Sequence, residues 1–209
     1  MTSGVRTSVV VVSAPDHPVD FHQLVDSSIN KPARYMGHEL GVEPRDWQAA
    51  QVRWALTYPE IYEVGSSNLG HIILYSILNA VPGQLCDRAY LPAADLAARL
   101  REQEQALFGV ESRRPLPAFD ILGFSLSYEL GATNILEMLD LCRVPLHASD
   151  RGDLPLTDPA APPLIFAGGP TATSNPEPYV PFFDFIALGD GEELLPEIGL
   201  VVAQAKADA

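Results

Sequence analysis

The sequence predicts an α/β fold in which one parallel sheet of five strands carries helices on both faces. Three observations support this prediction. From residue 51 onward, short apolar runs of strand length alternate with segments whose apolar residues recur at helical spacing. The alternation repeats five times, as expected for strands joined by crossover helices. The length of 209 residues is sufficient for one domain with a substantial core.

The first strand is expected at Val52–Tyr58, where apolar side chains alternate until Pro59 interrupts the pattern. A helix follows after a polar loop and ends at Pro82-Gly83. It is predicted from five apolar residues at helical spacing, namely Leu69, Ile72, Ile73, Ile77 and Ala80. Together these elements form the first strand–helix unit of the predicted sheet.

The second unit comprises a strand at residues 85–91 and a helix at residues 94–105, with Leu96, Ala97 and Leu100 on one side. Residues 118–125 form the third strand, which is apolar enough to be covered on both faces. The third helix is expected to start near Thr133 and to run to Cys142. Asn134 with Glu137 is an imperfect capping box at its beginning.

A Pro/Asp-rich surface loop at residues 150–163 precedes the last two strands. These strands are expected at residues 164–167 and 182–188, and a last helix at residues 192–203. Five strands favour a flavodoxin-like, Rossmann-type doubly wound sheet with the strand order 2-1-3-4-5. The topological switch point then lies between the first and third strands.

Residues 1–30 are expected to form a flexible tail, in which the valine run at residues 9–12 adds at most an edge strand. Residues 31–205 form the predicted domain. The 13 basic and 27 acidic residues give a net charge of −14, which argues against nucleic-acid binding. The apolar runs are too short for a membrane span or a signal sequence, so we expect no membrane partner and a cytoplasmic location.

Ligands of doubly wound sheets bind beyond the carboxyl ends of the strands, which nominates four loops. In the first loop, Ser66, Ser67 and Asn68 lead into a helix start, where free backbone donors can hold a polar ligand. The alternative is that Ser67 or Asn68 only caps the helix. In the second loop, Ser125 and Ser127 leave room for a bulky ligand, and Tyr128 offers a stacking face. Simple turn formation explains this second loop equally well.

The other two loops are rich in glycine. Gly168-Gly169 permits either close backbone approach to a ligand or a tight turn. Gly189-Asp190-Gly191 is no dinucleotide fingerprint, because Leu194 stands where a further glycine is needed. The acidic residues at this helix start also repel phosphate, which excludes a phosphate-binding loop.

No catalytic set is visible. The five histidines have no zinc-ligand spacing, so no metal site is predicted, and His71 is expected to be a partly exposed helix residue. Cys86 and Cys142 are expected to be buried packing residues. Arg113-Arg114 forms either an anion clamp or, more simply, a solvated turn. No Ser-His-Asp set or carboxylate pair has a catalytic spacing.

Motifs in one order along the chain resemble the N-terminal region of a family of cobalamin-binding-type radical SAM proteins, and especially its long cyanobacterial-type members. The resemblance covers residues 31–200. It rests on KPARY at residues 31–35, YPEIYEVG at 58–65, ESRRPL at 111–116, FDILGFSLSYEL at 119–130, AGGP at 167–170, NPEP at 175–178 and GDGEE at 189–193.

The resemblance implies that a flavodoxin-like domain precedes a radical SAM barrel in proteins of this family. The barrel's C-x3-C-x2-C motif holds a four-iron cluster that cleaves S-adenosylmethionine. Cys86 and Cys142 cannot supply three closely spaced thiolates, so the cluster and S-adenosylmethionine are expected on a barrel that this chain lacks. That barrel, in cis or in trans, is the expected partner.

The resemblance further implies cobalamin binding without a lower-ligand histidine, because no D-x-H-x-x-G motif is present. The residues expected to line the cofactor are Glu63, Gly65, Ser66, Ser67, Asn68, Ser125, Ser127, Tyr128, Gly168, Gly169, Gly189 and Gly191. The alternative is a scaffold or interaction domain that has lost cobalamin. A free-standing enzyme is the weakest interpretation, because no catalytic set is visible.

Overall fold

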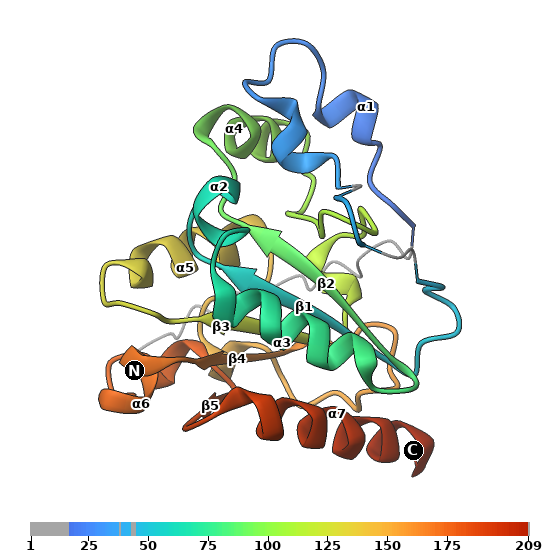
Figure 1. Ribbon diagram of the computed structural model, residues 1–209, viewed down its shortest axis with the longest axis vertical. Helices are drawn as coiled ribbons and strands as arrows, with labels where there is room; N and C mark the ends of the chain where they lie inside the picture. The colour runs from blue at the N-terminus through green and yellow to red at the C-terminus, as the bar shows by residue number, and fades with distance from the viewer. Residues whose placement is uncertain (1–16, 38, 43–44, 209) are drawn as a thin grey trace, which may run out of the picture.

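The computed structural model describes residues 17–37, 39–42 and 45–208, so the valine run at residues 9–12 lies outside the described residues. Five strands form one parallel sheet in the order β2-β1-β3-β4-β5 (Figure 1). This order confirms the predicted flavodoxin-like fold. The strands are β1 (Val52–Tyr58), β2 (Gln84–Tyr90), β3 (Ile121–Ser125), β4 (Leu164–Gly168) and β5 (Phe185–Ala187).

Helices cover both faces of the sheet. On one face, α3 (Leu69–Ala80) and α7 (Gly191–Asp208) pack over Trp54, Ile121 and Phe166 (Figure 1). On the other face, α4 (Ala94–Glu102) and α5 (Gly131–Leu141) contribute to a second apolar cluster. Burial on both faces explains why the central strands are almost uniformly apolar.

Aromatic side chains fill the layer between the sheet and the α3–α7 pair. The ring of Phe166 lies edge-on to Trp54, with centroids 6.1 Å apart, and stacks on Phe185 at 5.0 Å. The indole N–H of Trp54 donates to the side-chain oxygen of Gln84 at 2.8 Å. The one polar atom of this large buried side chain therefore has a partner, which avoids a desolvation cost.

The ends of several elements differ from the sequence prediction. β3 begins at Ile121 and β5 at Phe185, because the preceding residues form the 3-10 helices η2 (Leu116–Ala118) and η4 (Val180–Phe182). Proline, which lacks a backbone N–H, lies in both turns. α5 begins at Gly131, so Asn134 lies inside the helix and is no cap. Its side-chain amide instead donates to the carbonyl oxygen of Pro59 at 2.8 Å.

Part of the segment assigned to the N-terminal tail packs on the domain. Residues 17–30 include the short helix α1 (Phe21–Leu24), and Phe21, Leu24 and Ile29 are buried. The backbone N–H of Val19 donates to the carbonyl oxygen of Arg113 at 2.9 Å. The folded part of the chain therefore begins before residue 31.

Arg113 and Arg114 lie on aromatic rings. Their guanidinium carbons are 4.1 Å from the Phe21 ring centroid and 4.8 Å from the Trp47 ring centroid, respectively. These cation–π contacts fasten the N-terminal segments to the domain. The pair is thus neither a freely solvated turn nor two arginines converging on a common anion.

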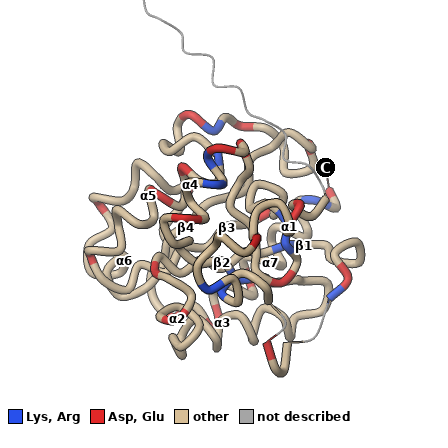
Figure 2. The backbone as a smooth tube through the Cα atoms, turned by 90° about the horizontal axis from the view of Figure 1, so that it is seen from above, with Lys and Arg blue, Asp and Glu red and all other residues tan. Residues whose placement is uncertain are grey.

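Acidic residues are spread over many separate segments of the chain (Figure 2). The predicted surface loop at residues 150–163 contains no regular helix or strand beyond the end of η3 (Ala148–Asp150). Arg151 in this loop is buried and bonds the Asp184 carboxylate at 3.1 Å, which anchors the loop to the start of β5. Within the described part of the chain, no helix has the length and apolar character needed to cross a membrane.

Candidate functional site

The nominated loops lie along one edge of the sheet, because all five strands are parallel. Ser125 at the end of β3 pairs with Gly168 at the end of β4, and Gly168 pairs with Ala187 at the end of β5. Tyr58 ends β1 beside Tyr90 of β2. Parallel topology thus brings together residues that are separated by more than a hundred positions in sequence.

Most candidates in the loop after β1 have structural roles. Glu63 lies in the short helix α2 (Tyr62–Gly65) and pairs with Lys31 at 3.2 Å and Arg34 at 2.9 Å. The hydrogen bond from Arg34 is the main cause that lowers the pKa of Glu63 to about 2. A Cβ on Gly65 would lie 2.4 Å from the Tyr90 ring, so this glycine is needed for packing.

The end of the same loop caps α3. The side-chain oxygen of Asn68 accepts from the His71 N–H at 2.9 Å, which confirms the capping interpretation for Asn68. The Ser67 hydroxyl donates to backbone oxygens of the preceding turn, at 3.0 Å to Val64 and 3.1 Å to Glu63. Ser66 beside it is half-buried. This loop therefore uses most of its polar groups to build its own structure.

Side-chain contacts bridge the switch point between β1 and β3. The Tyr128 hydroxyl donates to the Glu60 carboxylate, and this contact raises the pKa of Tyr128 to about 12. Gly131 at the start of α5 packs against Pro59, since a Cβ there would lie 3.3 Å from the Pro59 ring. The loops after β1 and β3 are thus joined to each other at this position.

At the carboxyl ends of β3 and β4, in contrast to the loop after β1, polar side chains lack partners among the described residues. Ser125 and Ser127 are half-buried, and neither hydroxyl has a hydrogen bond to another described residue. The side chain of Leu126 between them is fully buried, and its N–H donates to the Gly168 carbonyl at 2.7 Å. A Cβ on Gly168 would make only ordinary contact, at 3.5 Å, with Ala187. Ser125 therefore lies beside Gly168, a position without a side chain, and Ser127 follows two residues beyond the pairing.

Of the remaining candidate glycines, Gly169 and Gly191 have close neighbours that a side chain would meet, whereas Gly189 has none. Gly169 has a φ of +110°, and a Cβ there would lie 2.9 Å from the Leu126 carbonyl oxygen, so a side chain is excluded. It precedes the short helix α6 (Pro170–Ser174). Gly191 at the start of α7 faces Leu74 of α3, with a Cβ distance of 3.0 Å. Gly189 is exposed and has no neighbour that a Cβ would meet.

A buried charged network along β2 was not predicted from the sequence. The Asp87 carboxylate accepts from the backbone N–H groups of Arg88, Glu111 and Ser112, and from the Ser112 hydroxyl at 2.6 Å. Burial raises the pKa of Asp87, while these donors act in the opposite direction. The sequence contains one indication of this network, the adjacent charged residues Asp87 and Arg88 inside a strand. Successive side chains of a strand point to opposite faces of the sheet, so this pair places one charge on each face.

Arg88 joins two separate segments to this strand. Its Nε donates to Glu111 at 3.0 Å, and its Nη2 donates to Glu39 at 2.9 Å. The Tyr75 hydroxyl donates to the other Glu111 oxygen at 2.9 Å. Burial and the neighbouring Asp87 raise the pKa of Glu111 to about 7. The network thereby fastens Glu39 and the segment around Glu111 beside the edge strand β2.

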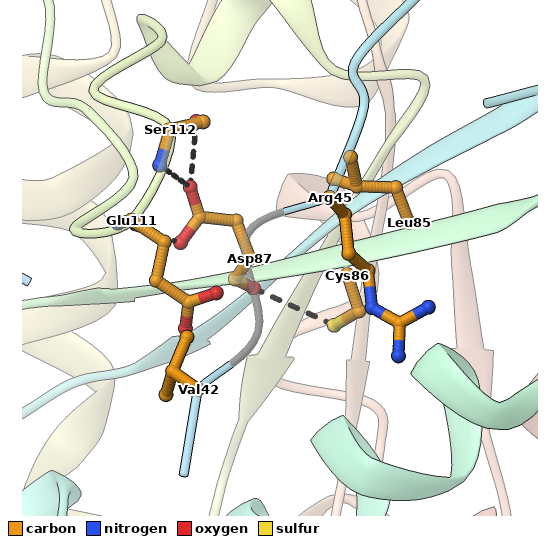
Figure 3. A pocket seen from close by; sticks show the side chains of 7 residues that line it. All are labelled: Val42, Arg45, Leu85, Cys86, Asp87, Glu111 and Ser112. Carbon is orange, nitrogen blue, oxygen red and sulfur yellow. Dashed lines mark hydrogen bonds between the residues drawn. The ribbon is translucent and has the colours of Figure 1, made fainter. Parts of the chain in front are cut away.

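A cavity of about 150 Å³ lies beside the first half of this strand. Figure 3 shows Asp87 and Glu111 on one side of it, and Arg45 and Leu85 on the other. Both carboxylates already have protein partners, so neither is free to bind a ligand in this cavity. Within residues 17–37, 39–42 and 45–208, no cluster of three His, Cys, Asp or Glu side chains suited to a metal ion occurs.

His71 and the two cysteines are all buried. His71 is not partly exposed but only 2% exposed, and its ring lies 5.6 Å from Tyr58 and 5.7 Å from Tyr90 between ring centroids. Neither ring nitrogen has a partner among the described residues. The N-terminal turn of α3 therefore points into the aromatic cluster. Cys86 and Cys142 are buried free thiols, as predicted.

Comparison with protein families matches residues 70–209 to the family described as "Radical SAM proteins, N-terminal". The matched segment extends from α3 to α7 and contains the edge formed by β3, β4 and β5. Comparison with curated proteins and with solved structures gave no match. Because the match covers more than half of the chain, the protein belongs to the family of N-terminal domains of radical SAM proteins.

Proposed function

We propose that the chain is an accessory domain that holds a ligand of a radical SAM enzyme at the carboxyl ends of β3 and β4. The observation that carries this proposal is the arrangement of Ser125, Ser127 and Gly168. The two half-buried hydroxyls lack partners among the described residues, and Ser125 pairs with Gly168, a position without a side chain. Hydroxyl groups that lack internal partners at a strand end are available to donate to and accept from a ligand.

The proposal narrows the set of twelve sequence candidates. Glu63, Gly65, Asn68 and Gly169 have internal contacts that account for their residue types. Tyr128 is held by Glu60 across the switch point. These residues shape the edge, whereas the two serines are proposed to contact the ligand.

Cobalamin is the candidate ligand, and it is proposed from the family resemblance. When bound, it would supply methyl-carrier chemistry to the catalytic domain, where the four-iron cluster and S-adenosylmethionine are proposed to lie. The hydroxyls and the absence of a side chain at Gly168 are compatible with a bulky ligand. His71 is buried between tyrosine rings, so it supports no role as a cobalt ligand from this position.

The test is a titration of the purified chain with hydroxocobalamin and methylcobalamin, followed by the visible spectrum. We expect saturable binding without a protein histidine on cobalt. Ser127→Ala should weaken binding by about tenfold, since one hydrogen bond is lost. Gly168→Val should weaken cobalamin binding more, because the added side chain occupies space that the glycine leaves to the ligand. Gly169 is unsuitable for this test, since any side chain there would distort the backbone.

Ser149→Ala is the matched control, because Ser149 is an exposed serine in η3, in the connection that precedes β4. It should leave the dissociation constant unchanged. Absence of saturation at about 1 mM ligand, with and without an added radical SAM catalytic domain, would refute cobalamin binding. The second candidate function, a scaffold without ligand, would then stand. It is favoured by the exposed apolar side of α3.

A further inference from the structure

α3 exposes apolar side chains on the side that points away from the sheet. Leu69 is 69% exposed, and Ile72 and Ile73 are each 36% exposed. Val64 in the adjoining α2 is 46% exposed. We name these four aliphatic side chains the α3 face. In a surface helix, apolar residues at spacings of three and four mark the side that packs against another element.

Two polar residues of α3 point in the opposite direction. His71 is 2% exposed and Asn79 is 6% exposed. The Asn79 side chain donates to the Cys86 carbonyl at 2.9 Å and accepts from its N–H at 3.0 Å. A surface helix ordinarily turns its polar side to solvent. α3 buries His71 and Asn79 and leaves only Ser76 among its polar residues exposed, where its hydroxyl donates to the Ile72 carbonyl at 2.9 Å, so aliphatic side chains dominate the outer side.

The sequence around α3 also lacks charge. Residues 64–86 contain no Asp, Glu, Lys or Arg, in a chain with 27 acidic and 13 basic residues. Charged residues are depleted at the centre of protein interfaces and abundant on surfaces that stay in solvent. The α3 face therefore has the composition of an interface, although it belongs to a strongly acidic protein.

We infer that the α3 face binds the radical SAM catalytic domain. Four partly exposed aliphatic side chains present at most a few hundred square ångströms. A stable interface between free molecules needs roughly 800 Å² per partner, so this patch alone does not hold two diffusing copies together.

A small apolar contact suffices for a domain that is tethered nearby, because tethering raises the effective concentration. The family consists of the N-terminal parts of radical SAM proteins, so the catalytic domain is the partner that meets this condition. The inference rests on the proposed accessory function, but it concerns the α3 side of the sheet rather than the ligand edge.

The test uses single surface cysteines labelled with an environment-sensitive fluorophore. Labelling is selective because both native cysteines are buried. Ile73→Cys reports on the α3 face, Leu130→Cys on the carboxyl edge, and Asp140→Cys on α5 at the opposite face of the sheet. The added probe is the purified radical SAM catalytic domain of a protein of this family, titrated up to about 1 mM, which is the effective concentration that a short tether provides. We expect a blue shift of the emission at position 73 and none at position 140.

Leu69→Glu, combined with the label at position 73, should weaken the association by about tenfold or more, because docking then buries a charge. Circular dichroism checks that this exposed substitution leaves the fold intact. Thr133→Glu, an exposed change on α5, is the matched control and should leave the association unchanged.

Three outcomes would overturn the inference. The first is a shift at position 130 without one at position 73, which would move docking to the carboxyl edge. The second is a shift at position 73 that grows with the concentration of the chain alone, which would indicate contact between copies. The third is the absence of a shift at position 73. Titration of the labelled protein with hydroxocobalamin separates the two proposals, because docking and ligand binding can each fail alone.

Discussion

Replacing His71 by leucine tests whether a buried, neutral histidine makes the fold sensitive to acid. Burial, with a smaller contribution from the Arg88 charge, lowers the pKa of His71 from 6.5 to about 3. In the unfolded chain the ring titrates near its ordinary value. Between these two values the unfolded state binds more protons than the folded state. His71 therefore causes a loss of stability as the pH falls below about 6.5, and the loss continues to about pH 3.

The magnitude follows from the two pKa values. Between pH 7 and pH 5, linkage through this one group lowers the free energy of unfolding by about 2 kcal/mol. His71→Leu should remove this part of the pH dependence. At pH 7 the variant should be at least as stable as the parent, because the two ring nitrogens have no partner among the described residues. The assay is urea denaturation at several pH values, followed by the fluorescence of the buried residues Trp47 and Trp54.

Asn79→Leu is the matched control on the same helix. Asn79 is buried and polar like His71, but its side chain is hydrogen-bonded to Cys86 and does not titrate. Its loss should lower stability by about 1–3 kcal/mol, equally at every pH. The free energy of unfolding of His71→Leu could instead show the same pH dependence as that of the parent. His71 would then have the same pKa in the folded and unfolded states, and the reasoning would be refuted.

Four further substitutions test the packing and the charges by the same urea assay. Gly65→Ala should lower the free energy of unfolding by about 1–3 kcal/mol, because its Cβ would lie 2.4 Å from the Tyr90 ring. Gly70→Ala, whose Cβ meets nothing nearer than 3.5 Å, should instead raise it by up to about 1 kcal/mol; equal effects would contradict the packing argument. Asp87→Asn should cost about 3 kcal/mol, since the carboxylate is buried and accepts several hydrogen bonds, and a neutral outcome would show that the network is dispensable. Arg101→Ala should change stability by less than about 1 kcal/mol, because its ion pairs are exposed, and a larger loss would contradict this.

The strand order could be predicted because the pattern of apolar residues constrains it. Five apolar strands separated by helices leave few arrangements that cover both faces with right-handed crossovers. The ends of the strands were less predictable. Ala118 and Phe182 are apolar enough to begin strands, but each is the last residue of a 3-10 helix that contains proline. Local propensity does not specify at which residue the chain leaves such a turn and enters the strand.

The candidate site was predicted in part. Parallel strands end at one edge, so the loops of Ser125 and Gly168 could be placed together from sequence alone. Sequence could not distinguish Gly168 from Gly169, because both are glycines at a strand end. The difference arises from the neighbours: a Cβ on Gly169 would lie 2.9 Å from the Leu126 carbonyl oxygen, whereas a Cβ on Gly168 would make ordinary contact with Ala187 at 3.5 Å. Sequence also missed the network of Asp87 and Glu111, whose members are 24 positions apart.

The sequence by itself determined the fold class, the edge of the sheet at which the candidate loops meet and the absence of charge around α3. These properties follow from composition and periodicity, which can be read along the chain without knowledge of tertiary contacts. Only the tertiary structure decided which side of α3 is buried. The helix is apolar over much of its circumference, so its periodicity permitted more than one orientation. Packing turned His71 toward Tyr58 and Tyr90 and bonded Asn79 to Cys86, and this left Leu69 and Ile73 facing outward.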